Sequence, residues 1–169
     1  DLPKPMVPLL GKPLMERTVE LLRENGITDI CATLGYNPAP ILSHFGGGED
    51  FGVHLSWRIE DKPLGTAGGV KNCMDFIGDE PFLVLSGDAA CDFDLRRLAE
   101  EHARSGAAVT MALYESPDPL RYGLVVPDAD GSVRCFIEKP PWERVVTNLV
   151  NTGIYVIEPR AMELVPEGE

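Results

Sequence analysis

The sequence predicts an α/β fold, a three-layer and mostly parallel sheet with helices on both faces. Apolar runs of strand length alternate with helical segments over the first two thirds of the chain, which is the pattern of repeated β-α units. The run 82–86 is apolar up to Ser86 and is closed by Gly87-Asp88, as expected for a strand that is buried on both faces. After Tyr114 the pattern changes to short strands and turns, which predicts an added small β-hairpin region.

Local signals place the predicted elements in order. The proline-rich segment 1–12 predicts a loop that holds Lys4 between two prolines. Pro13 suits the first position of a helix that runs to about Asn25, and Gly26 suits its C-terminal cap. Apolar patterning then predicts further elements, which are a strand over 29–34, a short helix over 38–45, a strand over 53–59, a helix over 66–74, the strand 82–86, a helix over 95–105, a strand over 108–114, hairpin strands over 124–126 and 133–138, a last strand over 153–157 and a helix from about 159.

Composition excludes several classes of function. The formal net charge of −12 over 169 residues argues against binding nucleic acid, which needs a basic face. Neither a run of 18 apolar residues nor a signal peptide is visible, which predicts no membrane association. The four cysteines are scattered without a C-x-x-C pair, so we expect free thiols in a reducing cytoplasm.

Asp88 is the first candidate for a functional carboxylate. Ligands of open α/β sheets bind just beyond the carboxyl ends of the strands, where the sequence places this residue. Taken alone, Ser86-Gly87-Asp88 also fits an ordinary Asx-turn.

Six short motifs then resemble, in the same order, the sugar-1-phosphate nucleotidyltransferases, and most of all the mannose-1-phosphate guanylyltransferases. The motifs are Leu2-Pro3-Lys4-Pro5-Met6, Pro63-Leu64-Gly65-Thr66-Ala67-Gly68, Gly87-Asp88, Tyr122-Gly123, Phe136-Ile137-Glu138-Lys139-Pro140 and Asn151-Thr152-Gly153-Ile154-Tyr155. The resemblance covers essentially the whole chain. It implies a Rossmann-like fold of the nucleotide-diphospho-sugar transferase type, and the reaction of an NTP with a sugar 1-phosphate to give an NDP-sugar and pyrophosphate, with Mg²⁺ as cofactor.

The resemblance also implies three catalytic residues. Asp88 would hold Mg²⁺, a cation that prefers one or two carboxylates with phosphate oxygens and water. Lys4 would neutralise the nucleotide phosphates, and Lys139 would bind the sugar phosphate. Catalysis would then consist of positioning and charge neutralisation, since the attacking oxygen belongs to the substrate. The structural alternatives are a solvated loop lysine at Lys4 and a lysine at a strand end at Lys139.

By the same resemblance, Glu138, Gly123 and Asn151 would line the sugar pocket. A carboxylate at Glu138 would accept hydrogen bonds from sugar hydroxyls and so discriminate between epimers. Asn151-Thr152 reads equally well as the polar start of a strand.

The residues expected to bind the nucleotide are Glu60, Gly65 through its backbone, and Thr66. Their segment has the strand–loop–helix order that presents N–H groups to a ligand. A carboxylate accepts hydrogen bonds only, which matches the two adjacent donors of guanine, and thymidylyl and uridylyl relatives look as if they carry Gln here. Glu60 is therefore the candidate residue that selects guanine. Asp61 could recognise the base instead, and Glu60 could also be a solvated residue at a strand end without a role in binding.

The chain also departs from the family pattern. The glycine-rich signature and the first strand that carries it are missing, and no second metal-binding Asp is found, so we expect residues 1–169 to be one nucleotidyltransferase domain that is incomplete at both ends and inactive alone. Asp92 or Asp94 could serve the metal instead, although Asp94 also fits a helix N-cap.

Other functions remain open at this point. A thymidylyl-, uridylyl- or cytidylyltransferase acting on glucose or heptose phosphate would keep the fold. A non-catalytic regulatory subunit that senses nucleotide sugars is a different class, but it would have no need for the metal carboxylate. A dinucleotide-dependent oxidoreductase lacks its G-x-G-x-x-G motif. The oligomeric state is left open, a homo-oligomer included.

Overall fold

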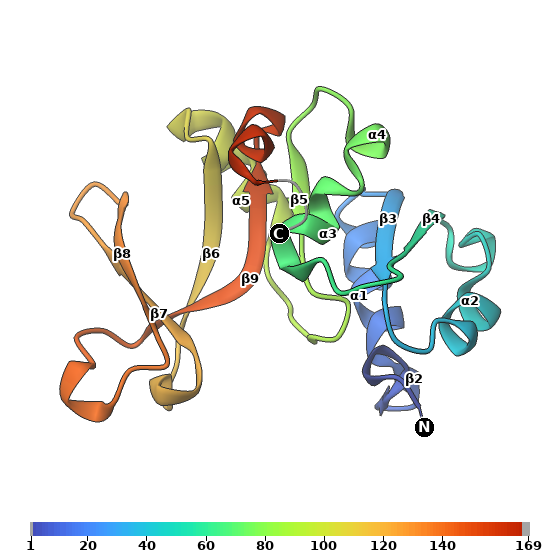
Figure 1. Cartoon of the computed structure of the whole chain (residues 1–169), viewed down its shortest axis with the longest axis horizontal. Helices are drawn as coiled ribbons and strands as arrows, with labels where there is room; N and C mark the ends of the chain where they lie inside the picture. Colours follow the sequence, from blue (N-terminus) through green and yellow to red (C-terminus); the bar gives the residue numbers. More distant parts are fainter. Residues whose placement is uncertain (1, 167–169) are drawn as a thin grey trace.

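The computed structural model describes residues 2–166 (Figure 1). Its helices are α1 (Leu14–Glu24), α2 (Ala39–Phe45), α3 (Gly65–Lys71), α4 (Met74–Ile77) and α5 (Leu95–Ser105), with short 3-10 turns that include η1 (Lys4–Met6) and η5 (Pro159–Leu164). Its strands are β1 (Pro8–Leu9), β2 (Lys12–Pro13), β3 (Asp29–Leu34), β4 (His54–Ile59), β5 (Phe82–Val84), β6 (Val109–Glu115), β7 (Gly123–Pro127), β8 (Val133–Glu138) and β9 (Leu149–Ile157).

Most predicted elements are present, and several differ in extent. The strand predicted over 82–86 ends at Val84, and the segment 1–12, predicted as a loop, contains η1, β1 and the start of β2. The predicted helix 66–74 is split into α3 and α4 at Asn72 and Cys73. The last strand begins four residues before the predicted start, because Thr152 and Gly153 form an irregularity inside β9 rather than its beginning. The segment after Pro159 forms a 3-10 helix rather than an α-helix.

The strands form two main sheets. β3 and β4 pair in parallel, and the larger sheet has the order β5-β9-β7-β8 with β6 also paired to β9. β9 lies antiparallel between β5 and β6, since residues 155–157 pair with both. The α/β fold class and the β7–β8 hairpin are confirmed. Among the described strands, however, β3–β4 is the only parallel pair, whereas a mostly parallel sheet was expected. The antiparallel insertion of β9 is a feature that the β-α alternation did not reveal.

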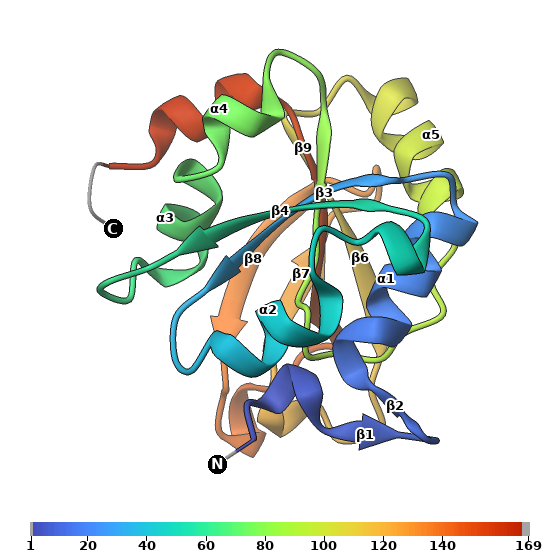
Figure 2. The ribbon, with the colours of Figure 1, turned by 90° about the vertical axis from the view of Figure 1, so that its right-hand side faces the viewer.

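Helices bury the sheets from several sides. One apolar cluster joins α1 and α2 to β3 and β4 through Met15, Val19, Phe45 and Leu55. A second cluster joins α1 to the larger sheet through Leu22, Leu95 and Ile154. Helix α1 therefore contributes to both clusters, and Figure 2 shows the β3–β4 pair crossing in front of the larger sheet.

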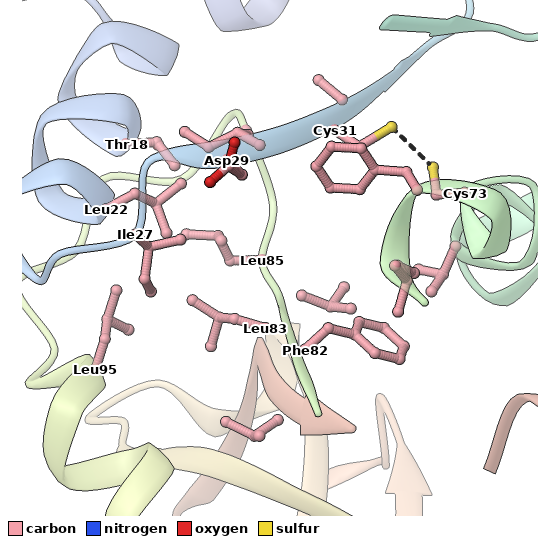
Figure 3. Close-up of a pocket in the computed structure, with 18 of the residues that line it drawn as sticks. Thr18, Leu22, Ile27, Asp29, Cys31, Cys73, Phe82, Leu83, Leu85 and Leu95 are labelled. Atoms are coloured by element: carbon pink, nitrogen blue, oxygen red, sulfur yellow. Dashed lines mark hydrogen bonds between the residues drawn. The ribbon is translucent and has the colours of Figure 1, made fainter. Parts of the chain in front are cut away.

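Between β3 and β5 lies a largely apolar cavity of about 860 Å³ (Figure 3). Among the described strands, β3 pairs only with β4 and β5 only with β9, so the two sheets do not join across this gap. Cys31 on β3 and Leu83 on β5 line it from opposite sides, and Leu22 and Leu95 line it from α1 and α5. The lining also includes Gly87 and Asp88, which connects the cavity to the candidate site.

Candidate active site

Lys4 and Asp88 are brought together by the fold. Lys4 Nζ lies 2.6 Å from Asp88 Oδ2, although 84 residues separate them in the sequence. Pro5 follows Lys4 in the short turn η1, and the turn places the lysine over the loop that leaves β5. The side chains are 70% and 30% exposed, respectively, so this ion pair is accessible to a ligand.

The Asp88 carboxylate is held by two donors. Ser86 Oγ donates to Asp88 Oδ1 at 2.6 Å, while Lys4 donates to the other oxygen. The Lys4 contact first, and the Ser86 hydroxyl second, hold the pKa of the Asp88 carboxyl below its usual value. Asp88 is therefore an anion at neutral pH, as a metal ligand requires. Ser86 is a residue that the sequence argument treated only as part of a turn.

The neighbouring carboxylates play a different part. The Asp94 side chain accepts a hydrogen bond from the Arg97 N–H at 3.0 Å, so it is the N-cap of α5. This contact supports the capping interpretation of Asp94 over the metal-binding one. Asp92 is exposed in the loop before it.

Glu60 lies at the end of β4, where its carboxylate faces the start of α3. Glu60 Oε2 accepts a hydrogen bond from the Leu64 N–H at 3.2 Å. A Cβ added at Gly69 would meet Glu60 Oε1 at 2.8 Å, so the glycine leaves room for the carboxylate. The sequence alone gives no sign that Gly69 has this role.

Gly65 and Thr66 begin α3 and are both exposed. Gly65 has a φ of +71°, a conformation that L side chains rarely adopt, and its surroundings are open. Glu60, Gly65 and Thr66 therefore border one accessible loop, in which the carboxylate already fixes one backbone N–H.

The proposed sugar residues are placed by strand register. Gly123 pairs with Glu138 across β7 and β8, and the pair Leu124–Val150 connects β7 to β9. One step along this antiparallel register, Gly123 is opposite Asn151, so Glu138, Gly123 and Asn151 form one row on one face of the sheet. A Cβ at Gly123 would lie 2.8 Å from Glu138 Oε2, which shows how close the carboxylate is to the glycine.

Lys139 follows this row and is 68% exposed at its side chain. Its φ is +36°, and its N–H donates to the Tyr122 carbonyl at 3.2 Å. The amine lies 3.7 Å from Glu138 Oε1, a loose contact that leaves it available to an anion.

The Asn151 amide is fixed by the irregularity of β9. Its Oδ1 accepts from the Gly153 N–H at 2.9 Å, and its Nδ2 donates to the Tyr155 hydroxyl at 2.7 Å. Gly153 has a φ of +76°, which lets the strand bulge so that residues 151 and 155 meet. Asn151 thus lies inside β9. Tyr155 holds the Asn151 amide, a role that the motif did not reveal.

The candidate residues form three groups in the structure. Lys4 and Asp88 are one group, Glu60 with Gly65 and Thr66 the second, and the row of β7, β8 and β9 with Lys139 the third. Figure 1 shows the third group's β7–β8 hairpin extending away from the helices that flank β3 and β4. Ion pairs join Lys4 to Asp88 and Lys139 to Glu138, whereas Glu60 is hydrogen-bonded to Leu64, the residue before Gly65.

The site offers Mg²⁺ one carboxylate. Within residues 2–166, no group of three or more His, Cys, Asp or Glu side chains could hold a metal ion. Asp88 is an ionised and accessible oxygen ligand, which fits a cation that takes one or two carboxylates and fills its remaining positions with phosphate oxygens and water.

No described helix combines the length and apolar character that crossing a membrane requires.

The fold and these groups define the class of the protein, which is a Rossmann-like α/β domain of the nucleotide-diphospho-sugar transferase type. The family described as "Nucleotidyl transferase" matches residues 1–167. The chain belongs to this family.

Individual relatives differ in substrate. The chain is 38% identical to the UTP–glucose-1-phosphate uridylyltransferase of Synechocystis over 99% of its length, and 34% identical to the mannose-1-phosphate guanyltransferase of Candida albicans over 97%. These matches span 47% and 46% of the two relatives, so the chain corresponds to about half of each. The structure of HddC from Yersinia pseudotuberculosis complexed with GMP-PN has a TM-score of 0.86 and 30% identity, and the match covers 100% of this chain and 73% of that one.

Proposed function

We propose that the intact protein transfers a nucleotidyl group from an NTP to a sugar 1-phosphate and releases pyrophosphate. The observation that carries this proposal is the Lys4–Asp88 pair, in which an accessible cation and an ionised carboxylate meet beyond the end of β5. A phosphate-binding lysine beside a metal carboxylate suits phosphoryl transfer, where positioning and charge neutralisation supply most of the rate.

The chain's own residues would act on different parts of the two substrates. Lys4 would bind the nucleotide phosphates, and Lys139 would bind the phosphate of the sugar. The row of Glu138, Gly123 and Asn151 would hold the sugar so that its phosphate oxygen faces the α-phosphate in line. Asp88 would hold Mg²⁺, which when bound would neutralise the charge of the reacting phosphates.

GTP is the nucleotide that we propose. Glu60 keeps acceptor capacity after bonding the Leu64 N–H, because each carboxylate oxygen has two lone pairs. Guanine offers two adjacent donors to such a group, and the similar HddC structure contains a guanine nucleotide analogue. Mannose 1-phosphate is the proposed sugar because of the guanyltransferase relatives.

A uridylyltransferase acting on glucose 1-phosphate is the second candidate. The Synechocystis relative has this name and the higher identity of the two. The contact of Glu60 with Leu64 favours this alternative to some extent, since it gives the carboxylate a structural role that needs no guanine.

The test is pyrophosphate release by the intact protein with Mg²⁺. Each NTP and dTTP is paired with mannose 1-phosphate and with glucose 1-phosphate. Turnover that depends on GTP and disappears in Asp88→Asn supports the proposal, whereas turnover with UTP and glucose 1-phosphate supports the second candidate. If no combination of substrates gives pyrophosphate but the protein still binds a nucleotide sugar, it would instead be a regulatory subunit.

The Glu60→Gln variant tests the base argument separately. Gln offers both a donor and an acceptor, so we expect the ratio of GTP to UTP turnover to fall by about 10-fold or more, a change that one lost hydrogen bond to a charged group would cause. Asp61→Asn is the matched control for the neighbouring carboxylate. An unchanged ratio in Glu60→Gln with a changed ratio in Asp61→Asn would make Asp61 the reader.

The cavity between β3 and β5 indicates where a further strand of the intact protein would lie. A further strand placed there would join the two sheets and bring a loop to Asp88, where the expected glycine-rich segment would meet the triphosphate. We therefore expect residues 1–169 alone to show no turnover, and a longer protein that includes the preceding residues to be active and to unfold at a higher temperature. Equal turnover by the short piece would show that the segment is unnecessary.

A further inference from the structure

The structure places two thiols in direct contact beside the cavity. Cys31 Sγ and Cys73 Sγ lie 3.4 Å apart and are joined by a hydrogen bond, although 42 residues separate them in the sequence (Figure 3). Cys31 is half-buried on β3, and Cys73 is buried between α3 and α4. The scattered cysteines of the sequence gave no sign of this pair.

We propose that Cys31 and Cys73 form a reversible disulfide when the protein meets hydrogen peroxide. This proposal concerns a modification site and does not depend on the proposed activity. Cys31 is the more accessible of the two thiols, so a small oxidant can reach it first. A movement of somewhat more than 1 Å would close the gap to the S–S bond length of about 2.05 Å.

The surroundings suit one attacking and one resolving thiol. Burial first, and the hydrogen bond with Cys31 second, raise the pKa of Cys73 to about 12, so this residue stays protonated. The Arg58 guanidinium, which Asp75 holds at 2.7 Å, favours negative charge near the pair. Cys31, the more accessible thiol, would therefore react first.

The chemistry balances with peroxide as the oxidant. The Cys31 thiolate attacks one oxygen, the O–O bond breaks, and a sulfenic acid and hydroxide form. The Cys73 sulfur then attacks the Cys31 sulfur while its proton passes to the departing oxygen, so the S–O bond breaks and water leaves as the S–S bond forms. In total two thiols lose two electrons and two protons, and the peroxide is reduced to two waters.

The bond would tie the α3–α4 junction to β3. Cys73 follows α3, whose first residues border the loop of Glu60, and Cys31 lies in the middle of β3. A bridge between residues 31 and 73 closes a long loop in the unfolded chain, which favours the folded state. We expect the temperature of unfolding to rise by roughly 10 °C and amide exchange over residues 65–77 to slow.

The experiment compares variants of the intact protein before and after hydrogen peroxide. Of the four cysteines in the sequence, the Cys91→Ser/Cys135→Ser variant retains only the contact pair, and it should give a peptide linked through residues 31 and 73, with the rise in unfolding temperature. Dithiothreitol should remove both effects. Cys31→Ser, which keeps the buried Cys73 intact, should show neither.

Three results would overturn the proposal. They are the absence of the 31–73 linkage with Cys31 oxidised to a sulfinic acid, linkage of either residue to Cys91 or Cys135 in equal yield in the unsubstituted protein, and a rise in unfolding temperature that persists in Cys31→Ser.

Discussion

The two lysine-carboxylate pairs of the candidate site are built in different ways. Lys4 and Asp88 come from segments far apart in sequence and meet at 2.6 Å through the packing of η1 over the loop after β5. Glu138 and Lys139 are adjacent in the chain, and their amine and carboxylate lie 3.7 Å apart on an exposed hairpin strand. The first pair is preformed by tertiary structure, whereas the second leaves both groups free to turn to a ligand.

This difference indicates a division of work. A preformed pair costs little reorganisation when charge develops, so it suits the reacting phosphates. Exposed and loosely held groups suit recognition, because their contacts form with the substrate. We therefore expect changes at Asp88 and Lys4 to reduce kcat, and changes on the hairpin to raise KM for the sugar phosphate.

Asp88→Asn should have the largest effect. The amide keeps the size of the side chain but removes the charge that would hold Mg²⁺, so we expect pyrophosphate release to fall by about 10²–10³-fold. Asp94→Asn is the matched control, since Asn is as good an N-cap as Asp and α5 should remain stable. Equal losses in the two variants would remove the special role of Asp88.

Lys4→Met should reduce kcat by about 10–100-fold, which corresponds to the loss of a charge-assisted hydrogen bond to phosphate. Met retains the length of the side chain, and Lys62→Met on the exposed loop 61–63 is a control with the same change in net charge. A rise in KM for the sugar phosphate with kcat unchanged would instead place Lys4 in the second substrate's site.

The sequence predicted the elements better than the way in which they meet. β3 and α5 have their predicted bounds, because their apolar patterns and end signals are local. The contact of Lys4 with Asp88, and that of Cys31 with Cys73, depends on tertiary packing that no local pattern encodes. The family motifs named Lys4 and Asp88 but said nothing of their contact.

The hairpin row shows the same limit. The alignment of Gly123, Glu138 and Asn151 depends on how β7 pairs with β8 and β9, whereas Asn151-Thr152 looked like the polar start of a strand. Ser86, Gly69 and Tyr155 support site residues through contacts that appear only in three dimensions.

Gly123→Ala should have a smaller effect, confined to the hairpin. Its new Cβ would lie 2.8 Å from Glu138 Oε2, but this atom ends a flexible and exposed side chain that can move. We expect KM for the sugar 1-phosphate to rise by several-fold, at most about 10-fold for a displaced hydrogen-bonding group. Kinetics with varied sugar phosphate and saturating NTP would measure it, and a fall in kcat with KM unchanged would contradict the recognition role.

The smallest effect concerns stability and pH. The folded pKa of Asp88 is lowered by Lys4, so the pair's stabilising contribution is present above the unfolded pKa of about 3.9 and is lost as the pH falls through the folded value. The Lys4 side chain is 70% exposed, and solvent screening limits the contribution to about 0–1 kcal/mol.

Unfolding of the intact protein and of Lys4→Met should therefore be compared at successive pH values. We expect the unsubstituted protein to be slightly more stable near neutral pH. The difference should shrink as the pH falls below about 3.9, the unfolded pKa of an Asp carboxyl, and disappear once Asp88 of the folded protein is protonated. Lys62→Met removes the same charge elsewhere and should lack this dependence. A difference that grows toward low pH would mean that Lys4 destabilises the fold there through repulsion by other cations, and the contact with Asp88 would then contribute nothing to the folded state.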